Sequence, residues 1–168
     1  MQRRELFPIL GMALAAGPLV GAEPRVFTGS EFALLRQLCE LLLPADETGP
    51  GATEAGVAEY IDLTLQYGTE QERALWRSGL LAVEALAQRE CGKGFGACSA
   101  AEQAKVMDRM AAGEQKPESA AERFFGMWKA AAVQGFGWSV AGRKALGYQG
   151  DKMTGTFTGC THAGRHQA

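Results

Sequence analysis

The sequence predicts an all-α fold: a single helical domain of about five main helices, followed by an extended, glycine-rich C-terminal tail. Three observations lead to this prediction. Four segments open with Ser or Thr and carry Glu three residues later, which is the pattern of a helix-capping box. Behind these starts, apolar residues recur every three or four positions, as on the buried face of a helix. The sequence shows no sustained alternation of apolar and polar residues of the kind that a half-buried strand requires.

The first two predicted helices lie on either side of a loop rich in proline and glycine. The first begins at the capping box of Thr28 and stops at Pro44, which cannot continue a helix. After the helix-breaking residues 45–51, the second begins at Thr53 and ends before Gly68. Their apolar faces carry Phe32, Leu35, Leu38, Cys39 and Leu42 in the first helix and Val57, Tyr60, Ile61 and Leu65 in the second.

Three further capping boxes begin the third, fourth and fifth helices. They are Thr69 with Glu72, Ser99 with Glu102, and Ser119 with Glu122. Gly92, directly after Cys91, ends the third helix, and Gly113 ends the fourth. A short sixth helix is expected over residues 139–146. Three aromatic side chains at helical spacing are assigned to the core: Trp76, Trp128 and Phe136.

Residues 1–22 are predicted to be an export signal. Residues 8–22 form an apolar stretch that is too short and too glycine-rich for a permanent membrane span. We interpret the segment as a twin-arginine signal, a route that carries folded cargo to the periplasm. The alternative is a general secretory signal with a chance arginine pair. The mature chain is expected to begin at Glu23, and the helical domain to cover residues 23–146. The predicted recognition residues of the signal are Arg3, Arg4, Leu6 and Phe7.

Residues 147–168 differ from the preceding helices because glycines punctuate them and few apolar side chains occur among them. So sparse a set of anchors cannot bury a backbone of this length in a core of its own. We therefore expect the tail to be either disordered or laid on a partner protein. The side chains expected to contact such a partner lie in the tail and just before it: Trp138, Tyr148, Met153, Phe157 and His162.

Composition and motifs identify no catalytic residue, cofactor site or metal site in this chain. The 17 basic and 19 acidic side chains nearly balance, which argues against a nucleic-acid partner. Residues 92–97 match a relaxed dinucleotide-binding pattern, but a polar helix end enters it where a buried strand is needed, so a flexible loop is preferred. Asp46 and Glu47 are interpreted as loop-capping residues and not as an acid–base pair. The absence of a Cys-x-x-Cys-His sequence argues against covalently bound haem c.

The four cysteines are expected to have three different roles. Cys39 lies on an apolar helix face, where a cysteine is expected to be buried. Cys91 and Cys98 are spaced too widely for the usual zinc or redox pair, so an intrachain disulfide that staples their loop is preferred. Cys160, in the tail, then has no obvious partner within the chain, and we predict that it forms an inter-subunit disulfide. The alternatives are a free thiol or a bond to Cys39.

Five strings spread over nearly the entire chain point to one family. They are the Arg3-Arg4 pair, residues 38–52 (LCELLLPADETGPGA), residues 55–61 (AGVAEYI), the Phe124-Phe125 pair and residues 147–162. Each string is weak by itself. Together they resemble the gluconate 2-dehydrogenase subunit 3 family, the small subunits of bacterial FAD-dependent sugar dehydrogenases, and within it the small (gamma) subunits of three-part glucose dehydrogenases.

The resemblance implies a complex with two partners. One is a flavin-containing catalytic subunit of the glucose–methanol–choline type, which holds FAD, with or without an iron–sulfur cluster, and lacks an export signal. The other is a multihaem cytochrome c, which anchors the assembly to the membrane. By this analogy the chain is a non-catalytic hitch-hiker carrier and maturation partner, and no catalytic residue is transferred to it. The competing hypotheses are an unrecognised periplasmic enzyme and a small redox- or metal-binding protein that uses Cys160, His162 and His166.

Overall fold

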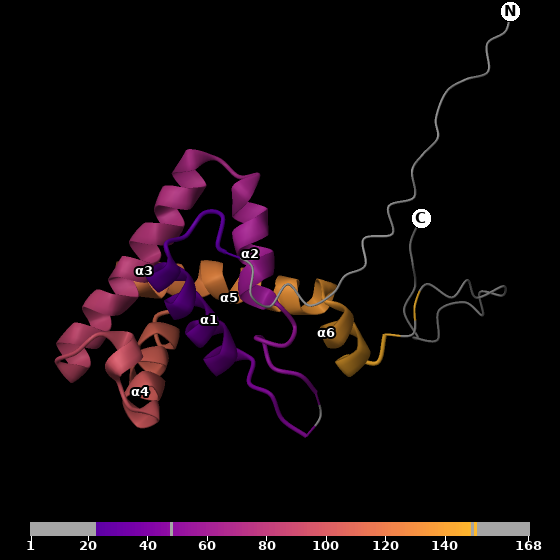
Figure 1. Ribbon diagram of the computed structural model, residues 1–168. Helices are drawn as coiled ribbons and strands as arrows, with labels where there is room; N and C mark the ends of the chain where they lie inside the picture. Colours follow the sequence, from indigo (N-terminus) through magenta and orange to yellow (C-terminus); the bar gives the residue numbers. More distant parts are fainter. Residues whose placement is uncertain (1–22, 48, 149, 151–168) are drawn as a thin grey trace, which may run out of the picture.

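The computed structural model describes residues 23–47, 49–148 and 150. This part of the chain is all-α, as predicted, and forms one helical domain (Figure 1). Its elements in chain order are α1 (Gly29–Leu42), α2 (Val57–Gln66), α3 (Glu70–Cys91), the 3-10 turn η1 (Phe95–Ala97), α4 (Ala100–Ala111), α5 (Ala120–Trp138) and α6 (Val140–Ala145). Within the described ranges, no helix is both long and apolar enough to cross a membrane.

All four predicted capping boxes are present, and they start α1, α3, α4 and α5. In the box of α1, the Thr28 amide donates to Glu31 Oε2 at 2.7 Å, and the Glu31 amide donates to Thr28 Oγ1 at 3.3 Å. Each such box satisfies amide groups that the helix itself leaves without a partner. The starts of these helices are therefore fixed by residues that lie within one turn of them.

Two boundaries differ from the prediction. α2 begins at Val57 and not at Thr53, because Gly56 takes a left-handed conformation (φ 69°) that interrupts a helix before it can extend backwards. Trp138 is the last residue of α5, although the sequence analysis grouped it with the partner-contact candidates in and just before the tail. The helical pattern of α5 thus continues through Gly135 and Gly137, which a surrounding tertiary structure tolerates.

The core is organised around α5, which packs against α2, α3, α4 and α6. Figure 1 shows α5 crossing the domain between α4 on the left and α6 on the right. A series of aromatic contacts links α3 and α5. The Trp76 ring of α3 lies 6.4 Å from Phe27 and 5.6 Å from Phe124 of α5, measured between ring centroids. Phe124 in turn stacks on Trp128 at 6.5 Å. Gly79 makes this crossing possible, because a Cβ atom at that position would overlap the Phe124 ring.

The N-terminal residues of the described domain are tied down by one buried carboxylate. Asp62 of α2, only 3% exposed, accepts hydrogen bonds from the amides of Arg25, Val26 and Phe27 at 2.8, 2.9 and 3.4 Å. Arg77 of α3 adds a bond to the Val26 carbonyl at 2.7 Å. The chain therefore enters the domain through a fixed segment held by α2 and α3.

Candidate partner-binding surface

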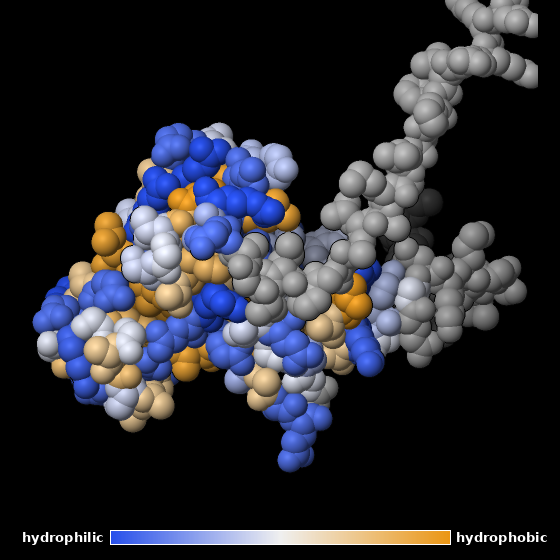
Figure 2. All heavy atoms as spheres, in the orientation of Figure 1, coloured by the Kyte–Doolittle hydropathy of each residue, from blue (hydrophilic) through white to orange (hydrophobic). Residues whose placement is uncertain are grey.

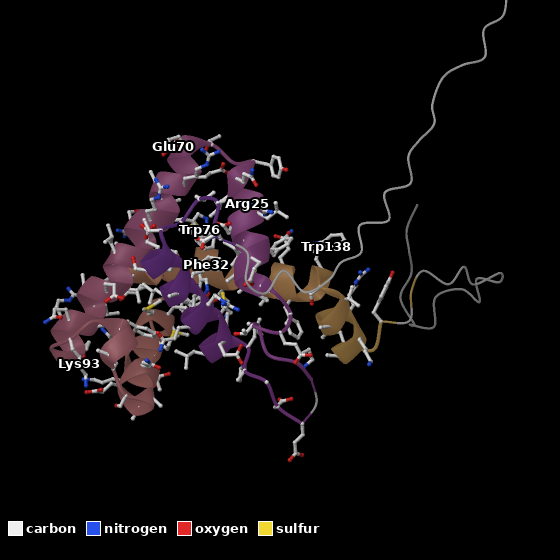
Figure 3. All side chains as sticks on the ribbon, viewed as in Figure 1. Arg25, Phe32, Glu70, Trp76, Lys93 and Trp138 are labelled. Atoms are coloured by element: carbon white, nitrogen blue, oxygen red, sulfur yellow. The ribbon has the colours of Figure 1, made fainter. Side chains whose placement is uncertain are left out.

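The strongest candidate for a binding surface is an exposed apolar corner where α5 ends and α6 begins. We define this α5–α6 corner by Trp138, Val140, Leu146 and Tyr148, which are 64%, 66%, 69% and 48% exposed. Single exposed apolar residues are normal on a monomer, whereas exposed apolar residues that gather on one part of the surface mark a contact site, and these four all come from residues 138–148. In Figure 3, Trp138 projects from the end of α5, whereas Trp76 and Phe32 lie among the packed helices.

Local geometry fixes the corner. Ser139 ends α5 and caps α6: its hydroxyl donates to the Phe136 carbonyl at 2.8 Å and accepts from the Gly142 amide at 2.8 Å. After α6, Gly147 adopts a left-handed conformation (φ 72°), and the Tyr148 amide donates to the Arg143 carbonyl at 2.9 Å. This arrangement holds the Arg143 guanidinium over the Tyr148 ring, 5.8 Å from its centroid. Both aromatic side chains of the corner are thus attached to a defined backbone.

The loop between α1 and α2 lies against the same corner. A Cβ atom built on Gly49 would come within 2.8 Å of Ala145 Cβ, so the loop and α6 are in close contact. Glu40 of α1 holds the base of the loop by accepting from the amides of Thr53 at 2.8 Å and Ala45 at 3.3 Å. Partial burial raises the pKa of Glu40, but these hydrogen bonds outweigh it and leave the pKa below its ordinary value.

The predicted loop-capping role of Asp46 is confirmed. Its carboxylate accepts from the Gly49 amide at 3.1 Å, and its main-chain amide donates to the Gly49 carbonyl at 3.1 Å. Glu47 is exposed beside it. Figure 2 shows hydrophobic atoms at the end of the molecule where α6 lies, next to more polar surface. The corner therefore offers an apolar centre with charged side chains near it, which suits a protein partner more than a small molecule.

Apart from the α5–α6 corner, an apolar hollow of about 440 Å³ lies between α2, α3 and α5. Ile61, Leu65 and Trp76 form its buried side, and Leu75 (55% exposed) stands at its rim. Its position between three helices, with mostly apolar walls, again fits contact with another apolar group. Among the residues that the structure describes, no group of three or more His, Cys, Asp and Glu side chains is arranged to hold a metal ion.

The other predicted sites have mixed outcomes. Trp76 and Trp128 are core residues as predicted, at 6% and 0% exposure, and Phe136 is partly buried against the core. Cys39 is buried as predicted, and burial raises the pKa of its thiol to about 12 even though the Trp128 indole donates to it. The remaining candidates lie outside the described residues: Arg3, Arg4, Leu6, Phe7, Met153, Phe157, Cys160, His162 and His166.

Residues 92–97 connect α3 to α4, as predicted, but they form a packed turn and not the flexible loop that was expected. Phe95 in their centre has no exposed surface, and its segment forms the 3-10 turn η1. Glu84 accepts from the Phe95 amide at 3.0 Å, and Gln103 donates to the Phe95 and Cys98 carbonyls at 3.2 and 3.1 Å. The expected disulfide between Cys91 and Cys98 is not formed in the structure, where both are free thiols.

Sequence reasoning also missed two buried acids on α2. Asp62 holds the N-terminal segment, as described above. Glu59 is 6% exposed and forms an ion pair with Arg36 of α1, in which Glu59 Oε1 lies 3.5 Å from Arg36 Nε. Both acids stand on the helix face that also carries apolar core residues, and that pattern by itself does not distinguish a buried acid from an exposed one. The only signal in the sequence was an acid two or three positions from an apolar residue of the helix face. Many exposed acids show the same spacing, so this signal is a weak indication of burial.

Comparison with known families identifies the chain. The model of the family described as gluconate 2-dehydrogenase subunit 3 matches residues 29–155, which is more than half of the sequence. The chain belongs to this family. It is thus a small subunit of a dehydrogenase complex of the gluconate 2-dehydrogenase type, which confirms the resemblance drawn from the sequence. Curated proteins give no match, and neither do solved structures.

Proposed function

We propose that this subunit 3 exports a flavin-containing catalytic subunit on its own twin-arginine signal and stays bound to it as a maturation and stabilising partner. The observation that carries the proposal is the family match over residues 29–155, which follows the predicted signal segment with its Arg3-Arg4 pair. A catalytic subunit without a signal can reach the periplasm only if it binds a chain that has one. FAD then belongs to the catalytic subunit of the glucose–methanol–choline type, and haem c to the cytochrome subunit.

The exposed α5–α6 corner supports this proposal. Its four apolar side chains come from the end of the described domain, where residues 151–168 continue the chain. A partner that covers Trp138 and Tyr148 would bury aromatic side chains of the kind that dominate protein interfaces. We propose that the tail residues Met153, Phe157 and His162 extend the same contact.

The test of the carrier role is a conservative double substitution, Arg3→Lys with Arg4→Lys. The receptor of the twin-arginine route reads the arginine pair, so we expect both this chain and its catalytic subunit to remain in the cytoplasm. Immunodetection of both proteins and dehydrogenase assays in periplasmic and cytoplasmic fractions measure this. The matched control is Arg89→Lys with Arg123→Lys, two exposed positions of the folded domain, which should leave export unchanged.

Two results would contradict the carrier role in different ways. Export of both proteins in the Arg3→Lys, Arg4→Lys variant would indicate the general secretory route or an independent signal on the partner. Retention of this chain alone, with the catalytic subunit still exported, would separate the two proteins and refute hitch-hiking. The mature chain purified by itself is expected to bind no flavin and to oxidise no sugar; a yellow, active preparation would refute the non-catalytic role.

We further propose that Cys160 links the subunit covalently to its catalytic partner. Cys39 and Cys98 are buried, whereas Cys160 lies in the tail that we propose to lie on the partner, so Cys160 is the cysteine that we assign to an external bond. Non-reducing electrophoresis of the complex should show a band of the summed mass that disappears in Cys160→Ser and under reductant. A band that persists in Cys160→Ser assigns the link to another residue, and no such band in the unmodified complex removes it.

A further inference from the structure

An apolar groove of about 220 Å³ lies between α1 and α3, which pack against each other (Figure 1). Leu34 and Leu80 form its floor and are 7% and 1% exposed, whereas Leu81 stands at its rim and is 66% exposed. A leucine that stays exposed beside two buried ones extends the apolar surface that the domain itself leaves uncovered. We refer to this site as the α1–α3 groove.

Two glutamates line the same groove, and each is held through one oxygen only. Glu31 Oε2 accepts from the Thr28 amide at 2.7 Å, and Glu84 Oε2 accepts from the Phe95 amide at 3.0 Å. Within the part of the chain that the structure describes, neither carboxylate forms an ion pair, and neither Oε1 atom accepts a hydrogen bond. The groove thus combines an apolar floor with two fixed negative charges that no described basic side chain neutralises.

This combination selects the chemistry of the segment that can cover the groove. Arginine side chains lay an apolar stem on apolar surface and keep the charged head at its edge. The head also forms paired hydrogen bonds with a carboxylate, which the head of a lysine cannot match. The α1–α3 groove therefore fits a segment in which arginines stand next to large apolar side chains, and it disfavours an acidic segment.

A segment of this kind precedes the described domain in the same chain. Residues 3–10 (RRELFPIL) contain two adjacent arginines, a single acid and four large apolar side chains. They lie outside the described residues, as do residues 11–22, which join them to the domain. The arginines and the apolar side chains of residues 3–10 complement the two carboxylates and the leucines of the groove.

The described chain enters the domain beside the groove. Arg77 of α3 donates to the Val26 carbonyl at 2.7 Å and so holds the entering segment on α3. Leu81 and Glu84 follow Arg77 by four and seven positions, so all three stand on one face of α3. Residues 11–22 span up to roughly 40 Å when extended, far more than the rise of about 5.4 Å per helical turn. The arginine-containing segment can thus reach the groove while the entering segment stays bound.

We propose that residues 3–10 bind the α1–α3 groove of their own chain. Phe7 covers the leucines of the groove, and the guanidinium groups of Arg3 and Arg4 pair with its two carboxylates. Because both partners belong to one chain, their effective concentration is on the order of millimolar, so modest contacts are sufficient. The contact goes beyond the proposed carrier role and does not depend on the export route. While it is made, the arginine pair faces the domain and not an export receptor.

The first measurement maps the contact in the purified full chain. The photo-crosslinking residue benzoylphenylalanine replaces Phe7, and the irradiated protein is digested and analysed by mass spectrometry. We expect an adduct within one chain, attached to residues 30–34 or 80–84, with a yield that does not depend on protein concentration. The measurement involves neither an export route nor the catalytic subunit, so failure of this contact and failure of the carrier role are separate results.

The second measurement identifies the groups that hold the segment. Leu81→Ser should lower the yield of the adduct at least about threefold, because it removes apolar contact area. The matched control is Leu75→Ser, which changes a leucine of α3 that is 55% exposed and outside the groove, and it should leave the yield unchanged. Raising the salt concentration from about 0.05 to about 0.5 M should lower the yield at least about twofold, because salt screens exposed ion pairs. Glu31→Gln with Glu84→Gln should remove this salt dependence.

Four results would overturn the proposal. Adducts outside the groove would place the segment elsewhere, and adducts only between chains would assign the groove to a second copy. Equal yields in Leu81→Ser and Leu75→Ser would exclude apolar contact in the groove. A yield that salt does not change in the chain with both glutamates would exclude the arginine–glutamate pairs. Circular dichroism checks the helix content of each variant, and if the double glutamine variant does not fold, the salt series still decides.

Discussion

Two tryptophans on α5, ten residues apart, have opposite surroundings. Trp128 has no exposed surface: its ring packs against Phe124 and Phe125, and its indole N–H lies 3.5 Å from Cys39 Sγ. Trp138, at the end of the same helix, is 64% exposed. The first faces Cys39 of α1 and is covered by the core, whereas beyond Gly135 the six-residue α6 leaves the last turn of α5 exposed.

The difference shows that residue type does not decide which aromatic side chains form the core of this domain. Both tryptophans occur on α5 among apolar residues, but only Trp128 lies where other helices cover α5. The part of α5 up to Ala132 stabilises the domain, and we assign the end of α5 to partner contact. Substitutions at the two sites should therefore separate stability from assembly.

The largest expected effect is that of Trp128→Ala. Removing a fully buried tryptophan leaves a cavity and costs about 3–5 kcal/mol of unfolding free energy, out of roughly 5–15 kcal/mol for a typical domain. It also removes the hydrogen bond to Cys39 Sγ. Chemical denaturation followed by circular dichroism measures the loss. A loss below about 1 kcal/mol would show that the core does not depend on the central part of α5.

The next effect in size is that of Gly79→Ala, which tests the close crossing of α3 and α5. The added methyl group would overlap the Phe124 ring, so the helices must move apart, at a cost of about 1–3 kcal/mol. The matched control is Gly126→Ala in the interior of α5, where a new Cβ meets nothing within 4 Å. That change should stabilise the domain by roughly 0.5–1 kcal/mol, because alanine is the better helix former. Equal effects at the two glycines would exclude steric overlap as the cause.

Trp138→Ala should change the unfolding free energy by less than about 0.5 kcal/mol, because the side chain is mostly exposed. Its effect should appear in assembly, as a reduced yield of the catalytic subunit that co-purifies with this chain. Tyr67→Ala is the control, since Tyr67 is an aromatic residue that is 82% exposed at the end of α2, away from the corner. If both variants retain the partner equally well, Trp138 does not belong to the interface.

The smallest effect is a change in how the stability of the domain depends on pH, caused by Glu102 in the first turn of α4. Hydrogen bonds from Lys93 and from Ser99 lower the pKa of Glu102 to about 2. Because the folded state binds this proton less readily than the unfolded state, the pair contributes stability above a pH of about 4.5. That contribution is lost as the pH falls from about 4.5 to about 2. Glu102→Gln should therefore flatten the decline of the thermal midpoint over this window.

The control for that measurement is Glu31→Gln, which changes the equivalent capping-box residue of α1. Both variants lose a carboxylate that accepts from a capping amide, but only Glu102 also pairs with a lysine among the ion pairs of the described chain. A pH dependence in Glu102→Gln that matches the unmodified chain would show that the Lys93 pair does not contribute.

Local signals allowed most of the fold to be predicted. Each capping box is complete within four residues, so the starts of α1, α3, α4 and α5 could be predicted without knowing what packs on them. The start of α2 could not, because Thr53 resembles a helix start and only the left-handed Gly56 after it delays the helix. Short-range patterns are sufficient where both capping partners lie within the first turn of the helix.

Long-range contacts explain what the sequence did not reveal about the sites. Phe95 is buried because α1 and α3 close over its loop, and glycines on either side suggested mobility instead. Asp62 binds amides more than 30 residues away in the chain. Trp138 was predicted to contact a partner, but its position on the last turn of α5 and its exposure required the structure. Spacing led to the prediction of a disulfide between Cys91 and Cys98, whereas the exposure of each thiol, with Cys98 buried and Cys91 partly exposed, required the structure.

If the predicted signal is removed after Ala22, the hydrogen bonds from residues 25–27 to Asp62 would set the geometry of that cut. The first amide bonded to Asp62 is that of Arg25, and the cut would leave only Glu23 and Pro24 ahead of it. A peptidase at the membrane surface would then work directly against the folded domain, with almost no spacer to thread into its active site. The rate of cleavage would depend on how readily residues 25–27 dissociate from α2. The mature chain would have only two residues ahead of Arg25, which is too short a segment for most proteases to bind.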